Sequence, residues 1–482
     1  MSARTRELMG LIPVSLLVSA GFAAVLTTRT QEVSDATLTY GLVFLGLCLA
    51  GHFFIRARLP DADPYLYPLA ALLAAFGLVM IYRINAEFAR EQAQWFVVGL
   101  VVFCGTVVFL RDHHALERYR YTIAAAGIAL LVMPRLPGIG APVNGAYLGV
   151  KLGPISFQPA EFAKIAIIVF LASYLRDTGD VLVRSRSTPM SGGQQALLFA
   201  IPAVLVVLVV LALGLGAAGT VLLAVFTASL VAVLRERPSV KHFGPLLLVW
   251  GLAMLMLLFI RDLGSSLMFF GGFLALLYVA TGRLSLVGVG ATMFLGGATF
   301  FANSVSHVQE RVDIWLDPFA KDVVQKEGYQ IAQSLYAQAD GGLFGQGFGQ
   351  ALLEIPGGGP LLPAAHTDLI YAVITDELGL FGAAGLILVY LMFAARGFKT
   401  ALVAGDGFSK LLAAGLTAVL TLQVFVIVGG VTKTIPLTGV TLPFVSYGGS
   451  SIVANMMLLA LLLIISDHAR KDRGSLQQGG LV

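Results

Sequence analysis

Runs of about 20 mostly apolar residues recur along nearly the whole chain, and this pattern limits the fold more than any other feature. A helix of that length crosses the hydrocarbon layer of a bilayer with its backbone hydrogen bonds satisfied internally. Of the 482 residues, 57% are hydrophobic and 12% are charged, which is too little polar surface to cover a soluble core of this size. The sequence therefore predicts an all-α polytopic membrane protein.

We identify fourteen candidate spans. The apolar stretch Ala196–Leu234 is too long for one helix, and Gly214, Gly216 and Gly219 lie at its middle, so it is divided into a hairpin of two spans. The other twelve lie near Leu8–Leu26, Leu38–Ile55, Tyr65–Ile84, Ala93–Leu110, Tyr121–Met133, Pro159–Leu175, Phe243–Ile260, Leu263–Ala280, Leu286–Phe301, Asp368–Ala395, Leu411–Val428 and Gly448–Ile465.

The distribution of positive charge predicts the orientation. An even number of spans places both termini on one side of the membrane, and twenty of the 31 Lys and Arg then fall in loops on that side. Cytoplasmic loops carry such an excess, so both termini are predicted to be cytoplasmic. The long connections Pro134–Ser156 and Ala302–Thr367 then lie outside. Because the second is long and holds almost all of the polar residues considered as candidates for chemistry outside the membrane, we expect the function to be carried out at the outer face.

Charged residues inside apolar segments are costly and tend to mark function. Glu161 and Lys164 are three residues apart, on one face of a predicted helix, where they can neutralise each other. This pair is interpreted either as a buried structural pair or as part of a catalytic site. Arg261 and Asp262 allow the same two readings, an interfacial pair that ends a helix or a functional pair.

Asp368 precedes the longest apolar run after the outer connection. One interpretation is that Thr367 or Asp368 is the N-cap of that helix, and the other is that the carboxylate is functional. Asp376 and Glu377 follow eight and nine residues later, about 12–14 Å along a helix, and are expected to serve packing or a polar network.

The outer connection also holds a glycine-rich run from Gly341 to Gly349, which lacks the Gly-Lys-Ser/Thr ending of a phosphate-binding loop. Tight turns are its simpler explanation. Arg311, Lys321 and Lys326 are either solvated loop charges or contacts for a diphosphate. The lone His366 is interpreted as structural in preference to metal-binding, and no His-rich ligand group is apparent. Scattered basic residues without interleaved aromatic residues argue against nucleic-acid binding.

Four motifs in this order resemble the SEDS proteins, the RodA/FtsW group of bacterial peptidoglycan glycosyltransferases. The motifs are Phe157–Lys164, Asp262–Ser266, His366–Gly379 and Pro443–Ser451, and the segment Gly328–Gly349 matches as well. The family has a ten-helix core, so the resemblance implies about four extra transmembrane helices here: an N-terminal hairpin in residues 1–60 and the hairpin at 196–234 inside a core of residues 61–470, followed by a cytoplasmic tail of residues 471–482. The extended N-terminus resembles the actinobacterial RodA-like branch.

The resemblance implies polymerisation of lipid II into glycan strands at the outer face of the bacterial cytoplasmic membrane, in elongation or division. Asp368 matches the family's essential aspartate, and we expect it to be the general base. The family also implies a divalent cation, Mg²⁺ or Mn²⁺, with ligands not identified, and a class B penicillin-binding protein as partner. The supporting or substrate-binding residues expected are His366, Thr367, Glu161, Lys164, Arg311, Gln333, Ser334, Ser446, Tyr447, Gly448 and Gly449.

Two positions differ from the family pattern. Leu148 and Gly149 stand where the family carries an Arg-Trp pair, and Ala364 stands where it often carries an acid. Two other functions are therefore considered. A flippase of lipid-linked precursor is disfavoured, because no inverted repeat with matching broken helices is apparent. A non-catalytic scaffold is disfavoured by the retention of Asp368.

Overall fold

The computed structural model describes residues 2–30, 35–110, 112–143, 146–152, 155–183, 263–304, 306–321, 323–326, 328–354 and 360–478, together with the single positions 224, 227 and 251. Eleven of the fourteen predicted spans coincide with helices in these ranges. The hairpin at Ala196–Leu234, the span Phe243–Ile260 and the pair Arg261 and Asp262 lie outside the described residues.

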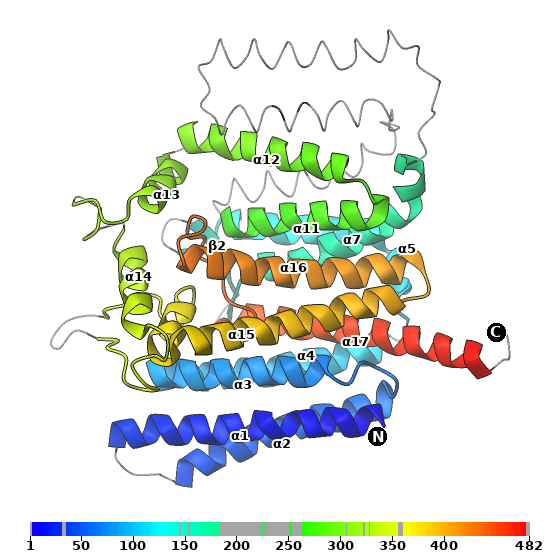
Figure 1. Cartoon of the computed structure of the whole chain (residues 1–482). Helices are drawn as coiled ribbons and strands as arrows, with labels where there is room; N and C mark the ends of the chain where they lie inside the picture. The colour runs from blue at the N-terminus through cyan, green and yellow to red at the C-terminus, as the bar shows by residue number, and fades with distance from the viewer. Residues whose placement is uncertain are drawn as a thin grey trace.

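The long helices among the described residues lie side by side with their axes nearly parallel, whereas α13 and α14 are inclined to them (Figure 1). Eight of them are long and apolar enough to cross a membrane, as predicted for a multi-pass membrane protein. The helices are α1 (Ala3–Thr30), α2 (Asp35–Arg58), α3 (Leu66–Ile84), α4 (Ala86–Phe109), α5 (Ala115–Arg118), α6 (Arg120–Val132), α7 (Pro159–Val183), α11 (Leu263–Thr281), α12 (Leu284–Ser304), α13 (Ser306–Leu316), α14 (Tyr329–Gly341), α15 (Ile370–Val403), α16 (Gly407–Val431) and α17 (Gly449–Gln478).

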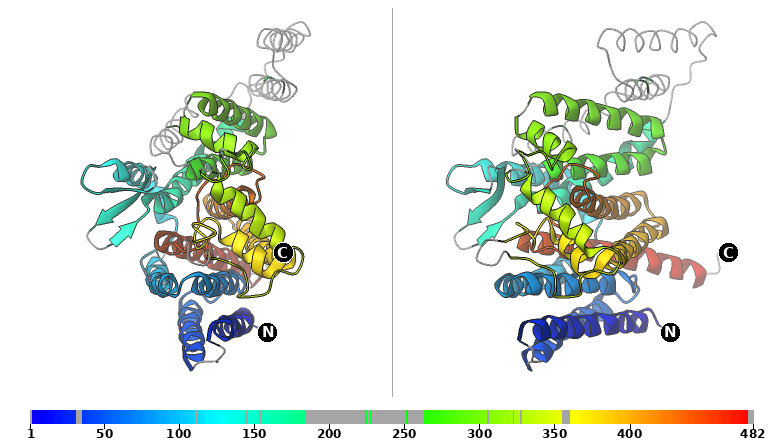
Figure 2. Two further views of the ribbon diagram at one scale, coloured as in Figure 1. Left: turned by 90° about the vertical axis from the view of Figure 1, so that its left-hand side faces the viewer. Right: turned by 60° about the vertical axis from the view of Figure 1, so that its left-hand side comes forward.

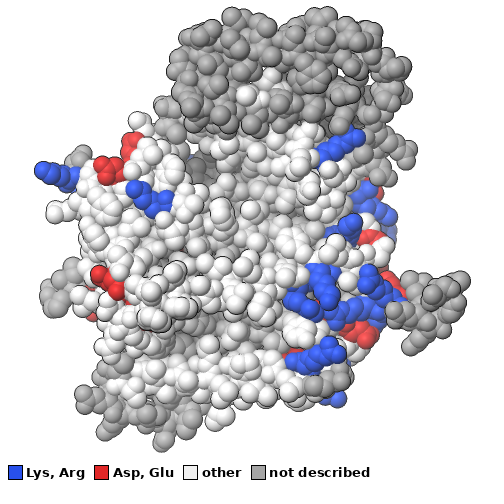
Figure 3. Space-filling model, viewed as in Figure 1, with Lys and Arg blue, Asp and Glu red and all other residues white. Residues whose placement is uncertain are grey.

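The two ends of the bundle differ in charge. The N-terminus and the C-terminus lie at the same end, here called the terminal end (Figure 1). In the same view, Lys and Arg side chains of the described residues gather at the terminal end (Figure 3). The opposite end, here called the site end, carries α13, α14 and the start of α15 (Figure 1). This grouping agrees with the charge count made from the sequence.

The N-terminal hairpin of α1 and α2 is fixed to the rest of the bundle by buried polar groups as well as by apolar packing. Arg4 forms an ion pair with Glu7 and donates to the backbone carbonyl of Ala62, which precedes α3. His52 of α2 lies 2.8 Å from the same carboxylate, measured from Nδ1 to Oε1. Since Glu7 and His52 are fully buried, these contacts give the hairpin one specific position against the following helices.

The connection Pro134–Ser156, predicted only as a long loop of an all-α protein, contains a small antiparallel sheet. Its strands are β1 (Gly140–Val143), β2 (Ala146–Leu152) and β3 (Ile155–Phe157), in the order β1-β2-β3. Val150 pairs with both Gly140 and Phe157. Gly149, at the position that differs from the family, pairs with Ala141 on β1. The sheet projects from the side of the bundle at the site end (Figure 2).

The span predicted near Asp368–Ala395 is confirmed as a helix, α15, but the prediction of one continuous helix is wrong. α15 begins at Ile370, and it is interrupted at Gly379, whose backbone has φ 65° and ψ −169°. A left-handed φ of this kind is readily adopted only by glycine. The interruption lets Gly345 pack directly on the backbone of Glu377 and Leu378. The glycine-rich run is therefore a set of tight turns against α15, as expected.

Candidate functional site

Asp368 lies at the site end, in the turn just before α15, and its side chain is half-buried. The N-cap of α15 is Leu369, without a side-chain hydrogen bond, so neither Thr367 nor Asp368 caps the helix. The structural interpretation of Asp368 as an N-cap is therefore wrong. A Cβ added to Gly439 would lie 3.6 Å from the Asp368 Oδ2 atom, which places the carboxylate against the segment that joins α16 to α17.

Burial raises the pKa of the Asp368 carboxyl above its ordinary value. Hydrogen bonds from the Thr367 side chain and from its own backbone N–H, and the charges of His366 and Arg311, act in the opposite direction but are outweighed. A carboxylate with a raised pKa is a stronger base than an exposed aspartate. Burial also lowers the pKa of the His366 imidazole below its ordinary value, and the nearby Asp368 carboxylate acts in the opposite direction.

Residues 432–448, here called the 432–448 segment, hold the turn that carries Asp368. The Ser446 hydroxyl donates to the carbonyl oxygen of Thr367 at 2.6 Å, and the backbone N–H of Tyr447 donates to that of His366 at 2.8 Å. The Ser446 hydroxyl also accepts from the N–H of Leu442. The two predicted site residues Ser446 and Tyr447 are thus brought to Asp368 through the backbone immediately before it.

The N-terminal turns of α4 contact the other side of the same segment. The Tyr447 hydroxyl donates to Glu91, and Gln92 bonds to the backbone of Ser446 and of Gly448. Phe88 packs against the His366 ring, with centroids 4.4 Å apart, and against Tyr447 at 5.1 Å. His366 is therefore held by aromatic packing, which favours the predicted structural role. The sequence did not identify these α4 residues.

α13 fixes the same segment from another direction. Arg311 donates from Nη1 to the carbonyl oxygen of Leu437 at 3.0 Å, and Trp315 donates to that of Lys433 at 3.0 Å. Lys433 returns a bond from Nζ to the carbonyl of Leu316. Arg311 is thus fixed near Asp368, and its guanidinium charge acts on that carboxyl.

Ser334 and Gln333 lie on α14. The Ser334 hydroxyl donates to the carbonyl oxygen of Val431 at the end of α16. Gln338, one turn further along, donates to the same oxygen at 2.9 Å. Gln333 is half-buried, and the glutamine that contacts α16 is Gln338 instead. These residues anchor α14 to the end of α16, and none of their bonds is to the turn that carries Asp368.

The buried pair predicted from the sequence is present. Lys164 Nζ lies 2.5 Å from Glu161 Oε2 and 2.9 Å from Gln423 Oε1, and Gln423 donates to the carbonyl of Thr441. Glu161 and Lys164 therefore join α7 to α16 and to the 432–448 segment, and pair with each other instead of with Asp368. This arrangement favours the structural interpretation of the pair.

Among the described residues, three other than glycine have a left-handed backbone, one in the turn before Asp368 and two in the 432–448 segment. They are Ala364 (φ 55°), Lys433 (φ 59°) and Phe444 (φ 65°). Such conformations cost about 1–3 kcal/mol and persist where the surrounding structure determines them, often at functional sites. Ala364, which replaces an acid of the family pattern, accepts backbone bonds from Thr367 and Leu369.

Asp376 and Glu377 serve a polar network, as predicted. Glu377 Oε1 lies 2.9 Å from Arg83 Nε at the end of α3, and its other carboxylate oxygen accepts from the N–H of Gly349. The carbonyl oxygen of Asp376 accepts from the N–H of Gln346. These bonds fix the glycine-rich turns to α3 and α15.

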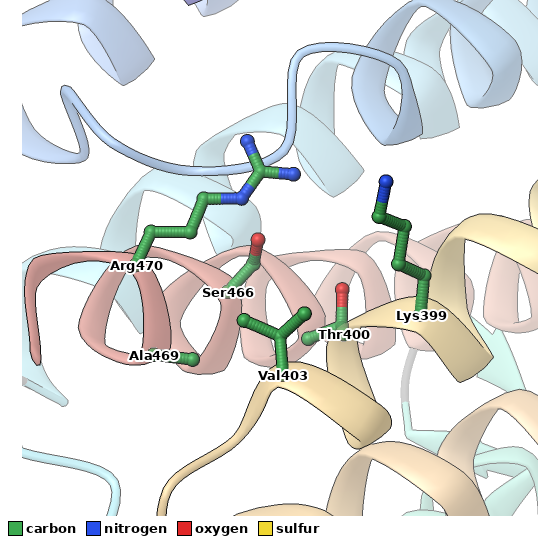
Figure 4. Close-up of a pocket in the computed structure, with 6 residues that line it drawn as sticks. All are labelled: Lys399, Thr400, Val403, Ser466, Ala469 and Arg470. Carbon is green, nitrogen blue, oxygen red and sulfur yellow. The ribbon is translucent and has the colours of Figure 1, made fainter. Parts of the chain in front are cut away.

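Two features of the terminal end are remote from Asp368. Within the described part of the chain, one group of three potential metal ligands lies together, Asp112, His113 and His114, which corrects the expectation that no His-rich group exists. Each already has a protein partner, since His114 contacts Asp112 and His113 bonds to Ser409 at 2.5 Å. A pocket between α15 and α17 is lined by Lys399, Thr400, Val403, Ser466, Ala469 and Arg470, none of which is acidic (Figure 4).

The family resemblance implies a divalent cation, and the residues at the site end decide whether such a cation could bind near Asp368. The Asp368 carboxylate is a hard oxygen donor, of the kind that Mg²⁺ and Mn²⁺ prefer. Mg²⁺ is commonly held by one or two carboxylates together with substrate phosphates. The residues around Asp368 therefore fit a cation shared between the protein and a phosphorylated substrate better than a cation held by protein alone.

Comparisons with known proteins agree with this architecture. The fold and the site define a multi-pass membrane protein whose functional residues gather at one end of a helix bundle. A family described as "Cell cycle protein", whose model is named for FtsW, RodA and SpoVE, matches residues 65–237 and 220–471. The chain belongs to this family, which confirms the RodA/FtsW resemblance.

Similar sequences extend over almost the whole chain. Peptidoglycan glycosyltransferase RodA of Mycobacterium tuberculosis is 37% identical over 97% of this chain and 91% of the relative. Stage V sporulation protein E of Bacillus subtilis is 29% identical over 85% of this chain and 98% of the relative. The mycobacterial similarity includes the N-terminal hairpin, in agreement with the actinobacterial RodA-like branch predicted from it.

Solved structures share the fold. A chain in a structure described as "Structural coordination of polymerization and crosslinking by a peptidoglycan synthase complex" aligns with a TM-score of 0.59 at 24% identity, over 85% of this chain and 98% of that one. The rod shape determining protein RodA of Thermus thermophilus aligns with a TM-score of 0.51 at 23% identity, over 84% and 96%.

Proposed function

We propose that this protein is a peptidoglycan glycosyltransferase that polymerises lipid II into glycan strands. The observation that carries the proposal is Asp368, a carboxylate with a raised pKa held between α15 and the 432–448 segment. Relatives 37% identical over nearly the whole chain carry that activity in their names. Because those relatives are RodA proteins, we assign the activity to cell elongation in preference to division.

The chemistry needs one base. The bond between the anomeric carbon of the donor sugar and its polyprenyl diphosphate breaks, and the diphosphate departs as a good leaving group that requires no general acid. The hydroxyl of the acceptor sugar must lose a proton as its oxygen attacks the anomeric carbon. Asp368 accepts that proton, and a single displacement converts the α-linked donor into a β-linked product. The raised pKa brings the carboxyl closer to the pH at which it works, which favours proton transfer.

The diphosphate needs positive charge nearby. The Arg311 guanidinium lies close enough to act on Asp368 and is fixed by its bond to Leu437. Lys321 and Lys326 are exposed in the connection between α13 and α14, where they are available to a phosphate. A bound Mg²⁺ or Mn²⁺ would supply further charge neutralisation between Asp368 and the diphosphate.

The orientation follows from the charge asymmetry. Lys and Arg gather at the terminal end, which we place on the cytoplasmic side according to the positive-inside rule. The site end then faces outward in the bacterial cytoplasmic membrane. Lipid II reaches Asp368 from the outer leaflet, where its sugars are exposed to the polar helices α13 and α14.

A partner is expected to complete the cell-wall polymer. One structural neighbour comes from a peptidoglycan synthase complex that coordinates polymerisation with crosslinking. We propose that this chain likewise binds a class B penicillin-binding protein, a transpeptidase anchored by one transmembrane helix. α15 offers a lipid-facing surface for such a helix, with Leu380, Leu388, Leu391 and Met392 about half exposed.

Polymerisation of fluorescent lipid II by purified protein tests the function. Wild type with Mn²⁺ is expected to form glycan chains, alone or with its cognate transpeptidase, and Asp368→Asn is expected to form none. Folded Asp368→Asn that polymerises at the wild-type rate would exclude Asp368 as the base. If folded wild type makes no polymer under any of these conditions but moves labelled lipid II between leaflets, the protein is a flippase instead.

A further inference from the structure

One face of α4 is devoted to the turn of residues 446–448. Phe88, Glu91, Gln92 and Trp95 recur at spacings of three and four residues, which places them on the same side of the helix. Phe88 and Glu91 contact Tyr447, and the Trp95 ring occupies the space where a side chain at Gly449 would lie. Each of these four residues therefore contacts either the 446–448 turn or Gly449, the residue that follows it.

Gln92 differs from its neighbours because it bonds only to backbone. Its Nε2 donates to the carbonyl oxygen of Ser446 at 3.3 Å, and its Oε1 accepts from the N–H of Gly448 at 3.1 Å. The residue is 4% exposed, so water does not replace these bonds readily. An amide is suited to this task, because it presents a donor and an acceptor side by side.

These bonds connect with Asp368 in two short steps. Gln92 bonds to the residues immediately before and after Tyr447, which are Ser446 and Gly448. The Ser446 hydroxyl and the Tyr447 N–H then bond to the carbonyls of Thr367 and His366, the two residues before Asp368. Loss of the amide would therefore leave the turn and the backbone before the carboxylate less well defined.

We propose that Gln92 is a positioning residue for the Asp368 carboxylate, acting through the backbone of the 446–448 turn. The expected loss of activity rests on the proposed function. The ordering of the turn before Asp368 by Gln92 does not depend on that function. The competing explanation is that Gln92 serves only to pack α4 against the bundle. α4 and α17 also pack through apolar residues and through Trp95 on Gly449, so helix packing does not depend on Gln92 alone.

Three variants test this proposal. Gln92→Ala removes both bonds, whereas Gln92→Glu keeps the acceptor for Gly448 and loses the donor to Ser446. Gln94→Ala is the matched control, because Gln94 is exposed two residues further along the same helix. Each is compared with wild type and with Asp368→Asn for thermal stability, lipid II polymerisation and amide hydrogen exchange of the peptides that contain residues 366–369 and 442–448.

We expect kcat to fall about ten- to hundredfold in Gln92→Ala, since a small misplacement of a catalytic group has effects of that size, with a small change in KM and in thermal stability. Gln92→Glu is expected to lose activity as well, and Gln94→Ala to retain it. Hydrogen exchange should rise in both peptides in Gln92→Ala and not in Gln94→Ala.

Wild-type kcat together with unchanged exchange in folded Gln92→Ala would overturn the proposal. If Gln92→Ala does not fold, Gln92→Glu decides by the same two measurements. A wild-type protein that makes no polymer refutes the proposed function instead. In that case the exchange data still decide whether Gln92 orders the segment before Asp368.

Discussion

Asp368 combines two properties that usually conflict, burial and a required negative charge. The Thr367 side chain and the Arg311 charge favour the ionised form of the carboxyl, yet burial prevails and its pKa is raised. A group of this kind is prepared to accept a proton because its charged form is less favourable in the folded protein than in water.

The raised pKa predicts the acidic side of the pH–rate profile. Polymerisation requires the ionised carboxylate, so kcat/KM should fall as the pH is lowered. The midpoint of this fall should lie above about 3.9, the ordinary pKa of aspartate. The measurement is the pH dependence of lipid II polymerisation under substrate-limited conditions. A half-maximal point at or below the ordinary aspartate value would contradict the assignment of Asp368 as the base.

The same shift predicts that the catalytic residue lowers stability. A folded pKa above the unfolded one means that the folded state binds the proton more tightly, so stability is lost as the pH rises through this interval. Asp368→Asn should therefore unfold at a higher temperature than wild type at pH 7. The difference in melting temperature should disappear when the pH is lowered below the pKa of Asp368 in the unfolded chain. Equal melting temperatures at pH 7 would argue against a raised pKa.

The buried pair gives a prediction of opposite sign. Lys164→Met leaves Glu161 buried with no cation beside it and should destabilise the protein by about 3–5 kcal/mol. Adding Glu161→Gln should recover most of the loss, because the unpaired charge is removed. Thermal unfolding of the two variants in detergent measures the difference. A double variant as unstable as the single one would show that the pair contributes more than charge compensation.

At this scale the sequence predicted the residues whose chemistry is conspicuous. Asp368, Ser446, Tyr447 and Arg311 were all expected in the site, and the structure places them around one turn. Gln92 was missed because a glutamine among polar residues at a helix start resembles a solvent-exposed first turn. Nothing local in the sequence indicates that this face of α4 meets a turn more than 350 residues away in the chain.

Among the elements, α15 carries the clearest departure from regular structure. The sequence predicted one continuous helix, because its apolar residues continue without proline, and the pattern contains no sign of the interruption at Gly379. The interruption depends on tertiary contacts, since it exists where the backbone of residues 341–345 packs against the helix. The periodicity of apolar residues indicates which side chains face apolar surroundings. It does not indicate whether the backbone hydrogen bonds of the helix are continuous.

Gly379→Ala tests this element. A methyl group at Gly379 would overlap with Gly345 N and Leu343 O, and the backbone has φ 65°. We expect a loss of several degrees in melting temperature and of polymerisation, since a conformation of this kind costs a non-glycine residue about 1–3 kcal/mol before the overlap is counted. Gly385→Ala is the control, because a Cβ there meets no atom within 4 Å. Equal stability of both variants would contradict the interruption.

The long connections were predicted by position and function but not by structure. The connection Ala302–Thr367 contains α13 and α14, and Pro134–Ser156 contains the three-stranded sheet. The strands have three to seven residues, too short for a reliable alternation of apolar and polar residues. Their pairing depends on contacts between strands that a single sequence does not display.

For the whole molecule, the class of fold was predicted correctly because hydrophobic length is a physical requirement of the bilayer and is visible in one dimension. The distribution of charge in turn predicts orientation. Lys326→Cys at the site end and Lys410→Cys at the terminal end, both exposed, should differ in their reaction with a membrane-impermeant maleimide in a background without Cys48 and Cys104.

In right-side-out vesicles we expect labelling of Lys326→Cys alone, and in inverted vesicles labelling of Lys410→Cys alone. The physical reason is the preference of Lys and Arg for the cytoplasmic side. The protein without Cys48 and Cys104 that keeps Lys326 and Lys410 is the control, because it should not react with the maleimide. The reverse pattern would place Asp368 in the cytoplasm and exclude polymerisation at the outer face.

The hydrogen bond between Ser446 and Thr367 joins residues 79 positions apart in the chain, and it has a consequence for biosynthesis. When Asp368 emerges from the ribosome, the residues that hold the turn before it have yet to be made. The carboxylate acquires its final surroundings only after α16 has inserted and the 432–448 segment has followed. We therefore expect a nascent chain in the membrane to lack an ordered Asp368 turn until the 432–448 segment has been made, and chains that end before it to lack that turn altogether.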